Sequence, residues 1–457
     1  MFNTRLESLR GIAALMVALG HSFIVLSVDE VPFIWAAQYG DLAGTQSFMT
    51  RFLLLFFNGG AAVTIFFVLS GYVLGLSLDS KPSSVRAAFS FYIKRVFRIF
   101  PAHWAVLLIV VSSVSLFHSY VKFPNTSAWY NWWFVATPTF QNVLENVFLL
   151  STNLNPVAWT LQIEILISLV FPVFYMLNRH SGNVVNGLVF LCLLYFAFLM
   201  QGNIYVLNAF VFFVGLSLAS VSPKSANILN RVARYLVFFA ALLGLLTTRF
   251  VFHYSELFII TLLECVFAAI IVWLLIVSRQ PKIIESILDH NVVRFLGRIS
   301  YSFYLIHFIV LYWLAYITLQ VISPDLTKSY PILFGLFFAV SSIFFAGILA
   351  NYSYRFVERP ALSLGKTISL FFYEKISAVV AMLRSESIVD RSTWRTALIG
   401  YSMPIPSGLK CLLALAPLLV IAWYSGVVDK SLVFSKAAYL QHTYELSDFL
   451  NFHVLLL

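Results

Sequence analysis

Charged side chains are scarce in this sequence. Asp, Glu, Lys and Arg make up only 11% of the 457 residues, whereas soluble globular domains carry about 25%. The hydrophobic residues account for 61% and include 46 Phe, 22 Tyr and 10 Trp. Composition alone therefore excludes an ordinary water-soluble domain.

Cysteine is equally rare. Cys192, Cys265 and Cys411 all lie inside apolar runs and show no paired spacing. The sequence therefore offers neither a disulfide framework nor a cysteine metal site, and we expect no metal. No internal repeat or low-complexity tract is visible either.

The net charge of +10 does not indicate nucleic-acid binding. The 29 Lys and Arg residues fall in separate segments between apolar runs rather than in one basic stripe. We therefore attribute the positive charge to membrane topology and expect no nucleic-acid partner.

Long apolar runs dominate the chain, and each is long enough for the roughly 20 residues that cross a bilayer as a helix. Continuous runs of this kind also exclude an outer-membrane β-barrel, whose strands alternate. The sequence predicts an all-α polytopic membrane protein with about eleven helices. The expected spans are 9–28, 52–78, 102–121, 157–177, 184–201, 203–221, 235–252, 257–277, 299–322, 331–353 and 410–428.

Basic residues are distributed unevenly between the two sides that these spans define. With a cytoplasmic N-terminus, 23 of the 29 Lys and Arg fall inside, as the positive-inside rule requires. The first span has no cleavage signature behind it and is expected to be an uncleaved helix. Two connections are long: an external loop at 122–156 with an aromatic cluster at 129–134, and an internal surface-lying linker at 354–409. The aromatic cluster suits an interfacial belt or a platform for sugar rings.

Titratable residues inside a membrane require a structural or functional explanation, because burying one there costs about 2.5–3.5 kcal/mol. The candidates are Arg10, His21, Glu164, Glu264 and His307. Arg10 and His21 are eleven positions apart, which places them on one helix face with a rise of about 16 Å. A guanidinium suits phosphate binding and an imidazole suits proton transfer. A snorkelling arginine and an interhelical histidine would give the same spacing.

Six segments in fixed order are similar to characteristic segments of the membrane acyltransferase family 3. They extend from the start of the chain to about residue 365. The segments are ESLRGIAALMVALGH (7–21), IFFVLSGYVL (65–74), FYIKRVFRIFP (91–101), VAWTLQIEILISLVFP (157–172), ISYSFYLIHF (299–308) and YRFVERPALSLG (354–365). The resemblance implies an integral membrane enzyme with ten core helices. Such enzymes move short acyl groups from acyl-CoA to extracytoplasmic sugars.

The resemblance also implies roles for individual residues. Arg10 and His21 match the family's Arg-x10-His, whose histidine is the catalytic base or acyl relay. Arg95 and Arg98 match its Arg-x-x-Arg before the third helix. We expect this pair in the inside loop 79–101, with both guanidiniums facing the same way to clamp phosphates. Ordinary positive-inside anchoring remains their alternative.

The remaining matches carry carboxylates. Glu358 belongs to the family's Phe-x-Glu-x-Pro segment, here FVERP. Glu164 lacks the second acid that relatives often carry, because Ile165 follows it. Glu164 would orient an acceptor hydroxyl, set a histidine tautomer or act as a structural ion-pair partner. Glu264 has no motif support.

We therefore expect His21 and Glu164 to be catalytic. Expected substrate-binding residues are Arg10, Arg95, Arg98, Trp159, His307 and Glu358. His307 is also open to interpretation as a second proton-handling group or as a buried core histidine. Ser70 and Gly71 of the LSGY segment are expected to permit close helix approach.

The expected function is an inner-membrane O-acyltransferase of a bacterial cell, with acyl-CoA as donor and an extracytoplasmic carbohydrate as acceptor. The expected organisation is a core at 1–365, a cytoplasmic linker at 366–409, an extra helix at 410–428 and a short external tail at 429–457. A proton-coupled transporter and a non-catalytic scaffold for polysaccharide assembly are the alternatives, because intramembrane Glu and His also mark proton relays.

Overall fold

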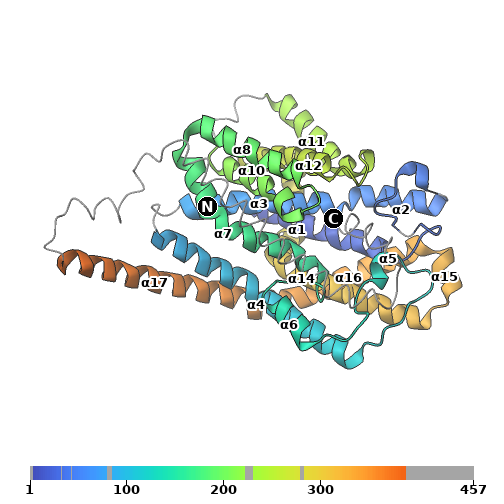
Figure 1. The fold of residues 1–457 in the computed structure, drawn as a ribbon. Coiled ribbons are helices and arrows are strands. Elements are labelled where there is room, and N and C mark those ends of the chain that lie inside the picture. Colours follow the sequence, from blue (N-terminus) through green and yellow to red (C-terminus); the bar gives the residue numbers. More distant parts are fainter. Residues whose placement is uncertain are drawn as a thin grey trace.

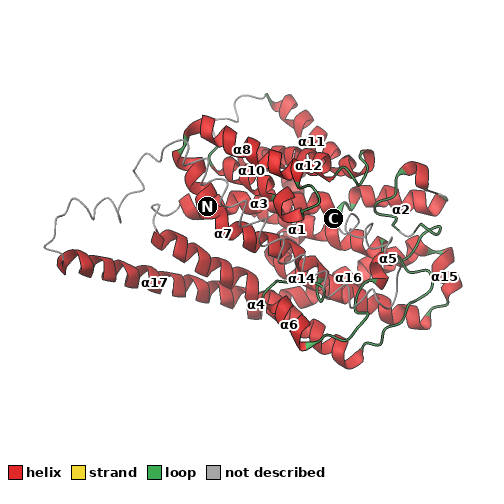
Figure 2. Ribbon diagram, viewed as in Figure 1, coloured by secondary structure: helices red, strands yellow, loops and turns green. Residues whose placement is uncertain are grey.

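The computed structural model describes residues 4–31, 33–42, 44–79, 85–221, 230–277 and 282–386, and these form a bundle of helices without a β-sheet (Figure 2). Eight helices among them are long and apolar enough to cross a membrane. The predicted fold class, an all-α polytopic membrane protein, is confirmed.

The first half of the bundle contains the 33-residue helix α4. Its helices are α1 (Thr4–Phe23), α2 (Thr45–Phe56), α3 (Gly59–Asp79), α4 (Val85–Phe117), α5 (Ala128–Asn131), α6 (Phe140–Val147), α7 (Trp159–His180) and α8 (Gly182–Leu199). Short 3-10 turns at Tyr39–Asp41 and Pro156–Ala158 precede α2 and α7.

The second half contains α14, which crosses the centre of the molecule. Its helices are α9 (Ile204–Leu207), α10 (Ala209–Ala219), α11 (Arg231–Val251), α12 (Leu257–Val277), α13 (Lys282–Asp289), α14 (Asn291–Val321), α15 (Pro324–Ser329), α16 (Pro331–Ser353) and α17 (Arg359–Glu386). A π-helical turn at Tyr354–Glu358 joins the last two.

Each of the first ten predicted spans overlaps a helix, whereas the eleventh, at 410–428, lies outside the described residues. Two of the ten are absent from the set of eight. The charged and titratable residues Glu7, Arg10 and His21 lower the hydropathy of α1, and the apolar helix at Ile204–Ala219 is short.

The first span ends earlier than expected, because α1 stops at Phe23 rather than at residue 28. The chain continues as buried, non-helical backbone that pairs with the loop after α4. Ser27 N donates to Asn125 O over 2.8 Å, and Ser127 N donates to Val25 O over 3.0 Å. Non-helical backbone is tolerated at depth only where protein surrounds it, as it does here.

Small residues bring the central helices into close contact. A Cβ atom at Gly11 of α1 would lie 2.5 Å from Gly297 N of α14. Similarly, a Cβ at Gly71 of α3 would lie 2.1 Å from Phe212 O of α10. The expected role of Gly71 in close helix approach is confirmed.

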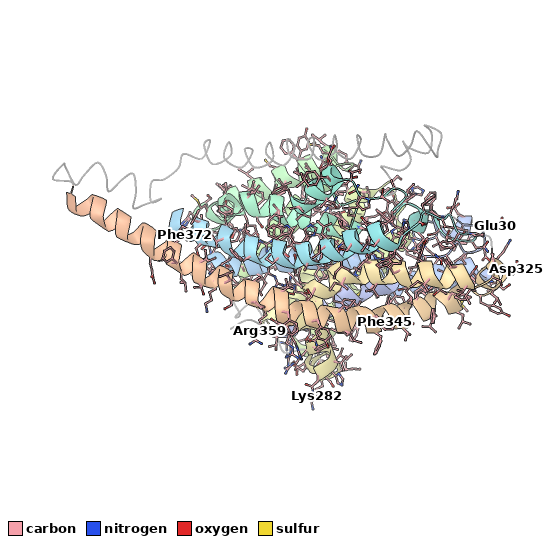
Figure 3. The ribbon with its side chains drawn as sticks, turned by 90° about the horizontal axis from the view of Figure 1, so that it is seen from below. Glu30, Lys282, Asp325, Phe345, Arg359 and Phe372 are labelled. Atoms are coloured by element: carbon pink, nitrogen blue, oxygen red, sulfur yellow. The ribbon has the colours of Figure 1, made fainter. Side chains whose placement is uncertain are left out.

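The loops predicted on one side do lie together. Asn125 Nδ2 donates to Pro324 O over 2.8 Å, and Lys328 pairs with Glu30 over 3.3 Å. Figure 3 shows Glu30 and Asp325 at one end of the molecule and Phe372 at the other. The alternation of sides thus agrees with the sequence, while the orientation in the membrane stays a prediction.

Helices α4 and α17 pack along each other and extend to the end of the bundle opposite α15 (Figure 1). The sequence placed Arg95 and Arg98 in a loop before the third span, and that expectation is wrong. Helix α4 already begins at Val85, because residues 85–101 contain enough apolar side chains to pack against α7 and α17. The C-terminal part of the expected linker, from residue 387 on, lies outside the described residues, whereas its start forms α17.

Candidate functional site

Two histidines from distant parts of the chain meet at the centre of the bundle. Nδ1 of His21, near the end of α1, lies 3.1 Å from Nε2 of His307 in α14. Their rings are stacked, with centroids 5.3 Å apart. His307 is only 1% exposed, so this contact is shielded from solvent.

The hydrogen bonds define the tautomers of the neutral pair. Nδ1 of His307 lies 2.7 Å from Tyr304 O, and a carbonyl oxygen only accepts, so this nitrogen carries the proton. Nε2 of His307 then holds a lone pair and accepts from Nδ1–H of His21. Nε2 of His21 is left with a lone pair, as a general base requires.

Aromatic side chains surround this pair. The rings of His21 and Trp129 of α5 lie 5.0 Å apart, and Phe308 contacts both Trp129 and Trp133. Nε1 of Trp133 is buried without a hydrogen-bond partner among the described residues. The loop at 122–156 thus brings one indole, that of Trp129, directly against His21, with a second, that of Trp133, behind it.

A first ion pair joins α4 to α7. Nη2 of Arg95 lies 2.9 Å from Oε2 of Glu164, and Nε of Arg95 donates to Ser168 Oγ over 2.9 Å. Ser70 Oγ of α3 donates to Oε1 of Glu164 over 3.2 Å. Both carboxylate oxygens therefore accept hydrogen bonds from neighbouring helices.

A second ion pair joins α4 to the π-helical turn. Nη1 of Arg98 lies 2.5 Å from Oε1 of Glu358, whose Oε2 accepts from Ser302 Oγ over 2.8 Å. The turn forms where Arg359 N donates to Tyr354 O, five residues back. The following Pro360 has no N–H to continue the α-helical pattern. The FVERP segment thus aims a buried carboxylate at Arg98.

Arg10 lies on α1 between these pairs and forms no ion pair among the described residues. Its Nε is buried without a hydrogen-bond partner there. The charges that act on it are those of both pairs, Arg98 with Glu358 and Arg95 with Glu164. Three guanidiniums and two carboxylates leave the cluster with one uncompensated positive charge, which suits an anionic ligand.

Arg10 and His21 are both part of α1, separated by about 16 Å along its axis at 1.5 Å per residue. The site therefore has an anion-binding end and a proton-accepting end joined by one rigid helix. Among the described residues, no three His, Cys, Asp or Glu side chains are grouped as metal ligands would be.

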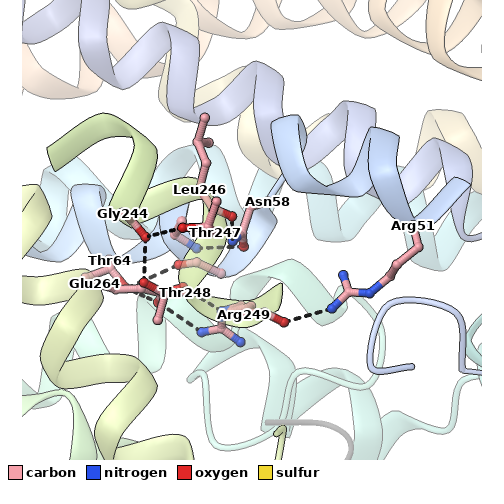
Figure 4. Close-up of polar contacts among 11 residues, drawn as sticks. Arg51, Asn58, Thr64, Gly244, Leu246, Thr247, Thr248, Arg249 and Glu264 are labelled. Atoms are coloured by element: carbon pink, nitrogen blue, oxygen red, sulfur yellow. Dashed lines mark hydrogen bonds and ion pairs between the residues drawn. The ribbon is translucent and has the colours of Figure 1, made fainter. Parts of the chain in front are cut away.

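Glu264 belongs to a separate cluster (Figure 4). Arg249 donates from Nε and Nη2 to its two oxygens over 2.8 and 3.2 Å, and Thr64 Oγ1 donates over 3.0 Å. Arg51 donates to Arg249 O over 2.8 Å. These contacts join α2 and α3 to α11 and α12, so Glu264 here stabilises the packing of these helices.

The structure brings together most of the residues singled out from sequence. His21 and His307 form one contact, while Arg10 lies among Arg95, Arg98, Glu164 and Glu358. The contacts of Glu164 fit the ion-pair role that the sequence left open; its catalytic role stays a prediction. Trp159 packs edge-on against Phe67, 6.2 Å between centroids, and its substrate contact also stays a prediction.

Sequence reasoning missed the hydroxyl partners of the ion pairs, among them Ser70, for which it expected only close helix approach. Ser168 lies four residues after Glu164, and this spacing on a helix places both on one face. That spacing was the available signal. Ser302, which donates to Glu358, lies 56 residues from it, and no local pattern links them.

Comparisons with known proteins show which family the chain is similar to. A family model described as an acyltransferase domain matches residues 3–351, which include His21, His307 and the three arginines. The peptidoglycan O-acetyltransferase OatA of Listeria monocytogenes is 27% identical over an alignment of 336 residues, and the match covers 66% of this chain and 51% of that protein. The chain thus spans about half the length of this relative. No solved structure matches.

Proposed function

The chain belongs to the membrane acyltransferase family 3, and from that premise we propose that it transfers a short acyl group from acyl-CoA to a hydroxyl of an extracytoplasmic carbohydrate. The proposal rests on two residues of the same helix, α1: Arg10, whose positive charge has no ion-pair partner among the described residues, and His21, which is hydrogen-bonded to His307. The first suits the phosphates of the donor, and the second suits the proton transfer.

In this proposal the donor lies along the length of α1. CoA carries its phosphates at one end of the pantetheine arm and the thioester at the other, and Arg10 and His21 are separated in the same way. Arg95 and Arg98 contribute positive charge beside Arg10, and Glu164 and Glu358 hold them in place. An anion that enters this cluster finds preorganised guanidiniums, which reduces the entropic cost of binding.

The chemistry takes place at Nε2 of His21. This nitrogen accepts the proton of the acceptor hydroxyl, and the oxygen bonds to the thioester carbonyl carbon. The carbon–sulfur bond then breaks, and the thiolate takes the proton from His21. Transfer through an acyl-histidine, with Nε2 attacking the thioester first, is the second route that this nitrogen offers.

The acceptor approaches from the loop side. Trp129 of the loop at 122–156 lies against His21, Trp133 of the same loop lies against Trp129, and indole rings pack against the apolar faces of sugars. The name of the Listeria relative describes O-acetylation of peptidoglycan, and a cell-envelope glycan is the acceptor class that we propose. The N-terminus then faces the cytoplasm, and the membrane is a bacterial inner membrane.

Acyl transfer in isolated membranes tests this proposal. Membranes containing the protein receive acetyl-CoA labelled in the acetyl group, and label in the glycan fraction and free CoA are measured together. We expect both products with the natural chain and neither with His21→Gln at equal protein level, because glutamine does not accept the proton. Equal label transfer by His21→Gln contradicts the proposal, as does CoA release without labelled glycan.

A further inference from the structure

We propose that His307 is a positioning residue that holds His21 in the tautomer whose Nε2 is the base. This inference rests on the proposed function only for its effect on rate, because the tautomer itself is a property of the resting protein. It assigns His307 a role different from the substrate contact expected from the sequence.

The geometry gives His307 a fixed orientation of its own. Nδ1 donates to Tyr304 O, one helical turn earlier, over 2.7 Å, so the ring is anchored to the backbone of α14. Asn155, just before α7, donates to the next carbonyl, Leu305 O, over 3.1 Å. The helix around His307 is therefore braced from a second element, and Nε2 points its lone pair at His21.

The backbone of α14 also packs tightly against α1. A Cβ atom on Gly297 would lie 2.6 Å from Glu7 O, so the two helices touch where both begin. This contact, together with the ring stacking, limits the movement of His21 relative to His307. The 3.1 Å hydrogen bond is thus supported at both helices.

The effect of His307 on the tautomer of His21 matters because free histidine in water favours the other tautomer, with the proton on Nε2. In that form Nε2 is a donor and does not accept the hydroxyl proton. An acceptor opposite Nδ1 reverses the preference, because only the Nδ1–H form makes the bond. His307 supplies that acceptor, in the way that carboxylates and carbonyls orient catalytic or metal-bound histidines elsewhere.

The same bond acts during the reaction. When Nε2 of His21 takes the hydroxyl proton, the ring becomes an imidazolium and its Nδ1–H bond to His307 becomes charge-assisted. The proton leaves again from Nε2 to the thiolate sulfur, so His307 ends in its starting state. His307 therefore stabilises the charged intermediate without touching the substrate.

The direct test is the tautomer. The protein is labelled with ¹⁵N-histidine, placed in lipid nanodiscs without substrate, and examined by ¹H–¹⁵N correlation of the ring nitrogens, with His21→Gln identifying the signals of His21. We expect Nδ1–H in the natural chain and a shift toward Nε2–H in His307→Phe, which keeps a ring but has no acceptor. Nε2–H in the natural chain overturns the inference, whatever the activity.

Kinetics separate positioning from packing. Glutamine places an oxygen near the position of Nε2, whereas asparagine reaches only the position of Nδ1. We expect His307→Phe and His307→Asn to lose about 10²-fold or more in kcat, on the scale of general-base catalysis, with the KM for acetyl-CoA unchanged. His307→Gln should recover at least tenfold of that loss.

A matched control is His118, which also lies in an aromatic cluster, with Nε2 2.8 Å from Tyr312 Oη. His118→Phe removes a histidine of similar surroundings and should leave the His21 tautomer and kcat within about twofold of the natural chain. Equal losses in His307→Phe and His307→Gln, with folded protein and an unchanged His21 tautomer, would show that His307 acts through packing.

Discussion

Arg95 and Glu164, 69 residues apart in sequence, lie 2.9 Å apart and are both buried to about the same extent, with side-chain exposures of 15% and 14%. Both carboxylates next to the three arginines are thus engaged in ion pairs, Glu164 with Arg95 and Glu358 with Arg98. Arg10 is therefore the guanidinium with capacity for an external anion.

Arg10→Lys should weaken binding of acetyl-CoA by about tenfold or more, because hydrogen bonds to charged groups contribute about 1.5–3 kcal/mol and a point charge does not replace a planar fork. Calorimetry with purified protein in nanodiscs measures this. The control is Arg179→Lys, whose guanidinium pairs with Asp79 away from α1. Equal affinities in both variants would argue against a donor site at Arg10.

The carboxylates of the two buried clusters should separate donor binding from stability. Glu164→Gln and Glu264→Gln each leave a guanidinium without its partner, which costs about 3–5 kcal/mol in buried pairs. Thermal unfolding in nanodiscs should show both losses. Only Glu164→Gln should also change acetyl-CoA affinity, because Glu264 belongs to the cluster with Arg249.

The Arg95→Gln and Glu164→Gln double variant sharpens this test. Removing both charges should restore part of the stability lost by either single variant, since no lone buried charge remains. Transfer that returns with stability would mean that Glu164 serves as an ion-pair partner. Transfer that stays below about 1% in the stable double variant, with donor binding intact, would support the catalytic role expected from the sequence.

The pairing of Arg5 with α13 predicts a pH dependence of stability. Hydrogen bonds from Arg5 and Arg294 lower the pKa of Asp289, which lies on α13 outside the membrane-spanning segments. A carboxyl group whose pKa is lower in the folded state stabilises the protein above its unfolded pKa, about 3.9. That contribution is lost as pH falls through the folded pKa.

Asp289→Asn should therefore lower the melting temperature at pH 7, and the difference from the natural chain should shrink as the pH falls below about 4. Thermal unfolding in nanodiscs across this range measures it. A constant difference at every pH would mean that the side chain stabilises α13 without its charge.

The membrane sidedness predicted from basic residues is testable at described positions. Gln141, in the loop at 122–156, and Thr367, on α17, are both exposed. Each is replaced by cysteine in an otherwise cysteine-free background. An impermeant maleimide should label the first in intact cells and the second only after permeabilisation. Labelling of both in intact cells would contradict the proposed orientation.

The sequence predicted the helices well because long apolar runs leave a membrane chain few other structures. It also placed Arg10 and His21 correctly on one helix, since both lie within a single regular element. The end of α1 at Phe23 was missed, because the following apolar residues are buried among loops instead of lipid. Hydropathy does not distinguish these two surroundings.

The contacts between helices were beyond sequence reasoning. His21 and His307 are separated by 286 residues, and Arg98 and Glu358 by 260. Such contacts depend on how α1, α4 and α14 pack, and no periodicity within one segment encodes that packing. The start of α4 was missed for a related reason: its arginines resemble loop charges until their carboxylate partners on other helices are known.

Trp133 provides the sharpest test of the acceptor side. Its Nε1 is buried and has no partner among the described residues, although an unpaired buried donor costs about 1–3 kcal/mol. Its ring lies 5.6 Å from Phe308 and 6.4 Å from Trp129, which itself contacts His21. In the proposed function this N–H donates to the acceptor sugar, and the cost is recovered when the sugar binds.

Trp133→Phe keeps an aromatic ring and removes the N–H. We expect stability to be unchanged or higher and the KM for the glycan acceptor to rise about fivefold or more, as for a lost hydrogen bond of about 1 kcal/mol or more, while acetyl-CoA affinity stays constant. Trp104 is the matched control, because its Nε1 donates to Val147 O over 2.9 Å. Trp104→Phe should lower stability and leave the acceptor KM unchanged. The opposite pattern, a stability loss in Trp133→Phe at constant KM, would place the acceptor elsewhere, because it would show that the indole N–H already has a partner within the protein.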